Sequence, residues 1–316
     1  MTAISMPSAK AEAARPVPAE RHGRRVRVGR IAAWALLWIF VLITLFPFYW
    51  MLRTSLSNNR MLFSDPSSWL PVAPTLGGYE RVFGLATIQE AQAQGGSGAS
   101  ISFWLYLRNS VIVATVITIG QVFFSAMAAY AFARLRWPGR DKVFFLFLTA
   151  LMVPPIFIHL PNFELMKNLG LLNTFAGIVL PYLFMTPFAV FFLRQFFLNV
   201  SREVEEAAML DGAGYPRIFF RLILPMSAAP IATLSILTYI NSWNEYFWPL
   251  LVTDPTNNDV RVLTVALGLF RSQTPQGSPD WAGLMAATLV AALPVLLLFA
   301  AFGKRIVNSI QFSGVK

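Results

Sequence analysis

The chain has 316 residues, of which 56% are hydrophobic and only 13% are charged, and its mean hydropathy is +0.58. Soluble single domains do not reach this profile, so the composition predicts an integral membrane protein. Cysteine is absent, which excludes disulfides, thiolate metal sites and cysteine nucleophiles. The formal charge of +10 would suit a nucleic-acid partner, but seven of the 25 Lys and Arg residues precede the first apolar run. There they predict a membrane-orienting tail.

Residues 1–30, rich in Ala, Pro and Arg, predict a disordered basic tail. Six apolar segments follow, each near the roughly 20 residues that cross a bilayer. They are 31–52, 106–130, 143–163, 173–195, 229–251 and 281–303. The first is too long for a signal peptide, and no small-residue cleavage site follows it. We therefore predict an all-α membrane protein with six transmembrane helices in a domain at 31–308 and a short tail at 309–316.

The cations predict the topology of these six helices. Most Lys and Arg residues lie in the N-terminal tail, in the connections after the second and fourth apolar segments, and at the C-terminal end. The positive-inside rule places these parts, and both termini, in the cytoplasm. The connections 53–105 and 252–280 then lie on the opposite face. In the first of them, QAQGGSGAS at 92–100 predicts a flexible insertion.

The connection after the fourth segment contains EEAAMLDGAGYPRIFFRLILP at 205–225. Ser201 is a suitable N-cap, and three glutamates, Glu203, Glu205 and Glu206, follow in the first turns, where the helix dipole favours negative charge. Gly212 and Gly214 stop this helix, and Pro216 suits the first turn of a second one. The pattern predicts a short helical hairpin on the cytoplasmic face.

Two interpretations of this hairpin are open from the pattern alone. Ala207 and Ala208 leave one side of the first helix almost without side chains, so a partner's groove can approach closely. The hairpin is then a docking plug flanked by acids. The alternative is an amphipathic connector that packs under the helix bundle.

The spacing of this stretch resembles a family signature. The order Glu206-Ala207-Ala208, three residues, Gly212, nine residues, then LILP at 222–225 resembles the EAA loop of the membrane subunits of ATP-binding-cassette importers. Asp211 before Gly212 also fits, whereas Leu222 stands where Ile is usual. LRNSVIVA at 107–114, AYAFARLRWPGRD at 129–141, NSWNEYFWPLL at 241–251 and SIQFSGVK at 309–316 are similar to the carbohydrate branch, which includes the second maltose-type permease subunit.

This resemblance implies the type I importer transmembrane fold and a permease subunit in the bacterial cytoplasmic membrane that carries a sugar or polyol. The loop 201–225 would be the coupling helix, docking an ATPase through Glu206, Ala207, Ala208, Asp211, Gly212 and Gly214. The implied partners are two nucleotide-binding subunits, which hold ATP and magnesium, a second homologous permease and an extracytoplasmic solute-binding protein. The resemblance also implies that the C-terminal residues Gln311, Gly314 and Lys316 contact the ATPase subunits. It further implies that the connection 252–280 faces the binding protein, with Asn257, Asn258, Arg261, Arg271 and Gln273.

The fifth apolar segment carries unusual polar residues near its outer end: Asn241, Trp243, Asn244, Glu245 and Tyr246. Polar and ionisable groups in a membrane span are costly and mostly face a cavity or a partner helix. The amides, the carboxylate and the aromatic rings suit the hydroxyls and apolar faces of a sugar, which predicts a solute pathway. The alternative is an interfacial tryptophan belt with bonds between helices.

Other functions fit the sequence less well. The chain has no phosphate-binding loop of its own, because Gly303-Lys304-Arg305 lacks both the preceding glycine and a following Ser or Thr. ATP hydrolysis is therefore expected on other subunits, and we predict no catalytic residues, metal or cofactor here. An ion-gradient-driven secondary transporter is the alternative, but its usual internal repeat is not visible. A membrane-embedded enzyme or metal site would have to be built with two histidines and no cysteine.

Overall fold

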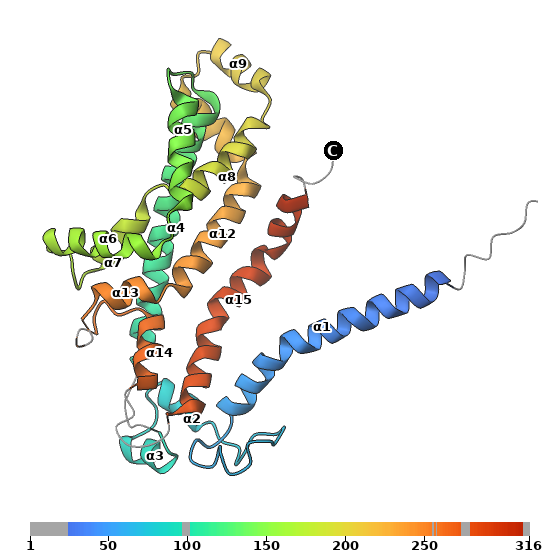
Figure 1. Cartoon of the computed structure of the whole chain (residues 1–316), viewed down its shortest axis with the longest axis vertical. Helices are drawn as coiled ribbons and strands as arrows, with labels where there is room; N and C mark the ends of the chain where they lie inside the picture. The colour runs from blue at the N-terminus through green and yellow to red at the C-terminus, as the bar shows by residue number, and fades with distance from the viewer. Residues whose placement is uncertain (1–24, 97–101, 255, 257, 273–278, 312–316) are drawn as a thin grey trace, which may run out of the picture. The chain divides into compact units, whose positions relative to one another are not determined.

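The computed structural model describes residues 25–96, 102–254, 256, 258–272 and 279–311, and this part of the chain contains helices and no strands (Figure 1). It divides into two compact units, residues 1–50 and residues 51–316. The first consists of most of helix α1 (Arg25–Ser55), with Pro47 inside the helix. This helix already begins at Arg25, so it includes the last six residues of the expected basic tail 1–30.

In the described residues, the expected six spans consist of three single helices and three bent helix pairs. Three helical stretches are long and apolar enough to cross a membrane: Gly29–Ser55, Phe103–Arg134 and Trp281–Gly303. Three more arise only when each of three bent helix pairs is taken as one span: Arg140–Met152 with Ile156–Asn168 (101°), Phe175–Leu183 with Pro187–Leu198 (44°), and Tyr215–Met226 with Ala228–Asn244 (79°). Prolines 154 and 155 lie in the sharpest break, where they remove backbone donors and end the preceding helix.

The second unit has the following elements in chain order. They are α2 (Gly77–Val82), α3 (Ile88–Ala93), α4 (Phe103–Arg134), α5 (Arg140–Thr149), the 3₁₀ turn η1 (Ala150–Met152), α6 (Ile156–Asn168), α7 (Phe175–Leu183), α8 (Pro187–Leu198), α9 (Arg202–Leu210), α10 (Tyr215–Ile218), the π-helical turn η2 (Phe219–Ile223), α11 (Leu224–Met226), α12 (Ala228–Asn244), α13 (Phe247–Val252), α14 (Leu263–Ser272) and α15 (Trp281–Gln311). Within this unit α9 lies at one end, and α2 and α3 lie at the other (Figure 1).

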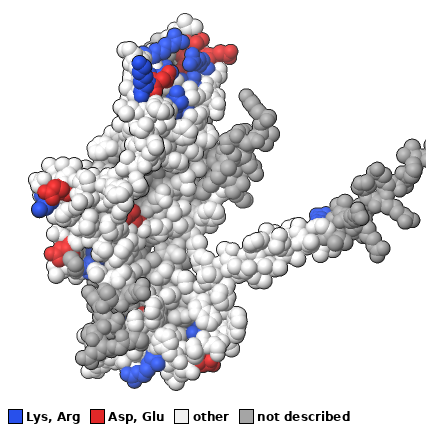
Figure 2. Space-filling model, in the orientation of Figure 1, with Lys and Arg blue, Asp and Glu red and all other residues white. Residues whose placement is uncertain are grey.

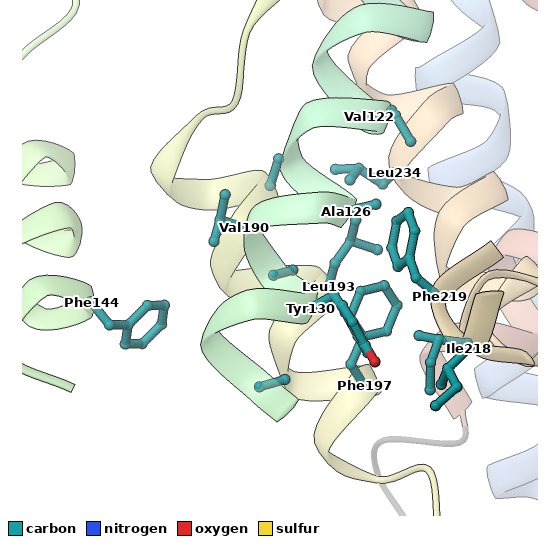
Figure 3. Packing of buried hydrophobic residues seen from close by; sticks show 14 residues of the cluster. Val122, Ala126, Tyr130, Phe144, Val190, Leu193, Phe197, Ile218, Phe219 and Leu234 are labelled. Atoms are coloured by element: carbon teal, nitrogen blue, oxygen red, sulfur yellow. The ribbon is translucent and has the colours of Figure 1, made fainter. Parts of the chain in front are cut away.

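Helix α4 is the centre of this unit, and α7, α8 and α12 pack along it. Ala126, Ala129 and Ala133 of α4 are almost fully buried. Small residues at such positions let helix backbones approach closely, which is the common solution where lipid supplies no hydrophobic driving force between helices. Leu193 and Phe197 of α8 fill the same apolar cluster (Figure 3).

At the end opposite α9, a buried ion pair joins α2 to the start of α15. Arg81 donates through Nε and Nη2 to the two carboxylate oxygens of Asp280, at 2.6 and 2.8 Å, and its Nη1 donates to Gln94 Oε1 at 2.8 Å. Asn59 Nδ2 donates to Gly95 O at 2.7 Å. The expectation of a flexible insertion at 92–100 is therefore wrong for residues 92–96, since these bonds hold Gln94 against α2 and Gly95 against Asn59. Residues 97–100 lie outside the described part.

Candidate functional site

The hairpin at 201–225 forms as its caps predict. Ser201 Oγ accepts a bond from Glu203 N at 3.3 Å at the start of α9, and Pro216 lies in the first turn of α10. The helix ends at Leu210, two residues before Gly212, whose φ of +79° lies in the left-handed region that glycine adopts without strain. Ala213 N then donates to Ala208 O at 2.9 Å, which closes the C-terminal turn. The sequence therefore specifies this hairpin locally.

A buried ion pair fastens α9 to the end of α4. Arg134 Nε lies 3.1 Å from Glu205 Oε1, with 3% and 9% of the two side chains exposed. Arg134 Nη2 also donates to Phe197 O and Val200 O, the carbonyls at the end of α8. Burial raises the pKa of the Glu205 carboxyl, and the guanidinium groups of Arg134 and Arg202 oppose that rise. One arginine thus joins α4, α8 and α9.

Apolar contacts beneath the hairpin reinforce this attachment. Ile218 and Phe219 are buried in the cluster that α4 and α8 form, and the Phe219 ring lies 5.3 Å from that of Tyr130 (Figure 3). Ala208 is half-buried against the same cluster. The sequence suggested that Ala207 and Ala208 together form a bare outer side of α9. Ala208 does not belong to that side, because the helix turns this position toward the core.

The opposite side of the hairpin is exposed. Its exposed residues include five of the six predicted docking residues, Glu206, Ala207, Asp211, Gly212 and Gly214. Sequence reasoning missed two apolar side chains beside them: Leu210, which is 90% exposed, and Tyr215, which is 54% exposed. Charged side chains gather at this end of the unit (Figure 2). Exposed leucine and tyrosine among charges are typical of an interaction surface.

A second candidate site is a cavity of about 390 Å³ among the spans. Its lining comes from α4, α7, α12 and the breaks between helices, and consists of Ile117, Gln121, Pro155, Tyr182, Thr186, Thr238, Asn241, Ser242 and Glu245. Most of these side chains are neutral and hydrogen-bonding, and Glu245 is the one charged residue among them. Gln121 Nε2 donates to Thr186 Oγ1 at 3.2 Å across the cavity wall.

The structure separates the five residues predicted for a solute pathway. Asn241 and Glu245 line the cavity. Trp243 is 5% exposed and belongs to an apolar cluster, where its ring stacks on Tyr239. Asn244 donates to Ile240 O within its own helix, and the Tyr246 ring lies against Gly268 of α14. Only two of the five therefore reach the cavity.

Glu245 lies where the fifth span breaks between α12 and α13. Its Oε1 accepts a bond from Trp248 N at 3.1 Å, and its carbonyl accepts from Thr264 Oγ1 at 2.7 Å. A carboxylate at this position satisfies a backbone donor that the broken helix leaves unpaired. Its carboxylate is fixed in the cavity wall by the backbone it caps.

Sequence reasoning missed the cavity residues on the other spans. Gln121, Thr186 and Tyr182 lie on three different segments, and no spacing in the sequence connects them. Polar side chains inside apolar runs were the available signal. His159 of α6 is half-buried: its Nε2 lies 3.3 Å from Tyr182 Oη and its ring meets Phe247 edge-on.

The remaining predicted contacts lie near the ends of the described part. Gln311 is the last residue of α15, whereas Gly314 and Lys316 lie outside the described residues. Arg261, expected to face a binding protein, is only 6% exposed, and its guanidinium lies 5.7 Å from the Tyr106 ring centroid. That expectation is wrong for Arg261, because the chain before α14 turns this side chain inward.

Comparison with known proteins gives a consistent assignment. Residues 121–311 match the family described as "Binding-protein-dependent transport system inner membrane component". The chain is 32% identical over 302 residues to the probable ABC transporter permease protein YurM of Bacillus subtilis, covering 94% of this chain and 92% of that protein. It is 32% identical to the sn-glycerol-3-phosphate transport system permease protein UgpE of Salmonella typhi (85% and 92% covered). It is 33% identical to the diacetylchitobiose uptake system permease protein NgcG of Streptomyces coelicolor (88% and 86% covered).

Solved structures share the fold. A chain from the crystal structure of a bacterial ABC transporter involved in the import of the acidic polysaccharide alginate aligns with a TM-score of 0.75 at 23% identity, covering 90% of this chain and 99% of that one. A chain from the alginate transporter in complex with its alginate pentasaccharide-bound periplasmic protein aligns with a TM-score of 0.60 at 13% identity, covering 91% and 98%. The type I importer transmembrane fold is therefore the fold of this chain.

Proposed function

Because the chain belongs to the family of binding-protein-dependent transport system inner membrane components, and so is a permease subunit of an ATP-binding-cassette importer, we propose that its hairpin 201–225 is the surface on which an ATPase subunit docks. One observation carries this proposal. Helix α9 is fastened to α4 and α8 through the buried Arg134–Glu205 pair, while its other side exposes Glu206 and Leu210. A helix that is fixed on one side and exposed on the other can pass a displacement from a partner to the spans.

The partners follow from this role. Two ATPase subunits hold ATP and magnesium, a second homologous permease completes the pathway, and an extracytoplasmic protein delivers the solute. The docking end is then cytoplasmic, and so are both termini. The gathering of cations at the α9 end supports this orientation (Figure 2). The C-terminal residues Gln311, Gly314 and Lys316 are proposed as a further contact with the ATPase subunits.

The solute is proposed to be a neutral sugar or polyol. The cavity lining contains no Lys or Arg to neutralise a phosphate or a uronate, and Glu245 repels an anion. Amide and hydroxyl groups from Asn241, Gln121 and Thr186 suit the hydroxyls of a sugar, and Tyr182 supplies an aromatic wall. Among the relatives, the diacetylchitobiose permease is named for a neutral solute and the glycerol phosphate permease for an anionic one.

Uptake by proteoliposomes that hold the assembled complex and its binding protein tests this function. We expect uptake of a radiolabelled neutral disaccharide to require ATP inside the vesicles and to be indifferent to an ion gradient. Glu206→Ala is expected to abolish the uptake without reducing the amount of inserted permease. Transport that follows an ion gradient, or that is restricted to glycerol 3-phosphate, would contradict the proposal.

A further inference from the structure

A basic hollow of about 490 Å³ lies beside the docking hairpin, where the loop after α4 meets the first residue of α9. Four arginines, one lysine and a tryptophan line it, with Asp141 as the one acid among the lining residues. Figure 2 shows Lys and Arg side chains gathered at this end of the unit. The hollow is a different site from the intramembrane cavity: the two share no lining residue, and the lining of the cavity contains no Lys or Arg.

Two of the arginines are already paired. Arg134 is held by Glu205, and Arg140 Nε lies 2.9 Å from Asp141 Oδ1. The other three cations, Arg136, Lys142 and Arg202, have no acid within ion-pair distance in the described part of the chain. These three cations share the hollow with Asp141, which Arg140 already holds, so they repel one another, and a ligand with several anionic oxygens removes that repulsion.

The position of the hollow indicates which anion it holds. The apolar surface of α5 begins immediately after Lys142: Val143, Phe145 and Leu146 are 46%, 71% and 70% exposed. Trp137 lies in the wall, and tryptophan is enriched at the level of lipid head groups. The hollow therefore opens where the polar end of a span meets its acyl-chain surface, which is the depth of a phospholipid phosphate.

We propose that this hollow binds the phosphate head group of an anionic phospholipid, of the phosphatidylglycerol or cardiolipin class, through Arg136, Lys142 and Arg202. Basic pockets at the cytoplasmic ends of transmembrane helices recognise such head groups. Arg202 is the first residue of α9, so the bound lipid joins the docking hairpin to the membrane surface. The lipid then holds the outer end of the hairpin, while Arg134 holds its inner side. An effect of the lipid on ATPase coupling rests on the proposed docking function of the hairpin, whereas the binding of the lipid does not.

Native mass spectrometry of the full-length chain in nanodiscs tests the site directly. The probes are phosphatidylglycerol and phosphatidylcholine, and the variant is Arg136→Gln/Lys142→Gln. The matched control is Arg217→Gln/Arg221→Gln, which removes the same charge from exposed positions of the neighbouring segment that do not line the hollow. We expect the wild type and the control to retain phosphatidylglycerol. The Arg136→Gln/Lys142→Gln variant should retain at least fivefold less of it.

Three results would overturn the proposal. Equal loss in both double variants would make the effect one of general surface charge. Displacement of the lipid by millimolar inorganic phosphate would make the hollow a soluble-phosphate site. Equal retention of phosphatidylcholine would remove the head-group selectivity. The folding of both variants is checked by their elution as a single species with unchanged helical circular dichroism.

A second measurement separates the site from its consequence. ATP hydrolysis by the assembled complex is compared in nanodiscs with and without phosphatidylglycerol. We expect the anionic lipid to raise the stimulated rate of the wild type, and not that of Arg136→Gln/Lys142→Gln, whose two residues lie outside the docking hairpin. Selective lipid retention with no change in hydrolysis would support the site and contradict its link to the docking hairpin.

Discussion

At the scale of single residues, adjacent glutamates have opposite environments. Glu205 is buried against Arg134, whereas Glu206 is exposed on the outer side of α9. Adjacent positions on a helix lie about 100° apart, so one can hold the helix in place while the other remains available to a partner. The sequence pattern gives both residues the same appearance, and only the fold of α4 against α9 distinguishes them.

Arg134 and Glu205 are expected to contribute unequally to stability. Arg134→Gln removes the ion pair and also the donor to the two carbonyls at the end of α8, and breaking a buried pair in this way costs about 3–5 kcal/mol. Glu205→Gln leaves the guanidinium on those carbonyls and should cost less. Thermal unfolding of the purified chain measures both, with Glu206→Gln as the exposed control. If the double variant's loss equals the sum of the single losses, the two groups do not interact.

Leu210 is expected to be the main apolar contact of the docking surface. It is 90% exposed, and burying a leucine against a partner is worth about 1.5–3 kcal/mol. Leu210→Ala should therefore weaken ATPase binding about tenfold or more, measured by titrating the purified ATPase subunit onto the permease. Leu85→Ala is the matched control, because Leu85 is 74% exposed near α2, at the other end of the unit. Equal affinities in the wild type and Leu210→Ala would exclude Leu210 from the interface.

At the scale of elements, Gly212 determines where α9 ends. A Cβ built at this position would meet no atom within 4 Å, so crowding does not explain the glycine; its φ of +79° does. Gly214, by contrast, has an ordinary φ of −76° and caps α10.

Substitutions at Gly212 are expected to follow backbone conformation and not side-chain size. Gly212→Ala forces an L-residue into the left-handed region, at about 1–2 kcal/mol, whereas Gly212→Asn is tolerated there. The coupling of ATP hydrolysis to uptake should fall more for Gly212→Ala than for the bulkier Gly212→Asn. The reverse order would indicate a steric requirement at the docking surface.

The elements also show how far sequence reasoning reaches. The caps and stops of α9 and α10 were predictable because they are local: Ser201, Gly212 and Pro216 act on their own turns. The 101° bend after α5 was not, since the prolines at 154 and 155 indicate a break but not its angle. Arg81 and Asp280, which are 199 positions apart, lie together only because α2 packs against the start of α15.

At the scale of the whole molecule, the apolar runs predicted six spans because each hydrophobic segment must cover a bilayer thickness. The composition of the cavity was not predictable in the same way. Its lining comes from several segments, and two of the five residues singled out in the fifth span reach it. Which face of each helix meets the cavity is decided by tertiary packing, as for Trp243, which packs into a core cluster instead.

The orientation of the whole chain gives a further prediction. Reporter fusions within 97–101 and after Lys316 should report opposite sides of the membrane, with the C-terminal fusion cytoplasmic. A fusion after Gly212 should agree with the C-terminal one, since the positive-inside rule gives both the same side. The six-span scheme places an odd number of spans between these two fusion points. If both fusions reported the same side, the number of spans between them would be even, and the scheme would be wrong.

The glutamate of the cavity is expected to influence solute charge. Glu245→Gln keeps an oxygen acceptor for Trp248 N while it removes the negative charge from the lining. Uptake of a neutral disaccharide should therefore be largely retained, whereas competition by anionic sugars such as glucuronides should increase. Unchanged exclusion of the anions would mean that Glu245 does not face the solute.

Docking through α9 is the central claim, and cysteine cross-linking measures it most directly. The chain contains no cysteine, so Leu210→Cys introduces a single reactive thiol on the exposed side of the hairpin. In the assembled complex, a short bismaleimide should join this thiol to a cysteine-bearing ATPase subunit, and the yield should change when ATP binds. Leu85→Cys should give no such product. Complete labelling of Leu210→Cys by a bulky water-soluble maleimide in the assembled complex, with no cross-link, would contradict the account.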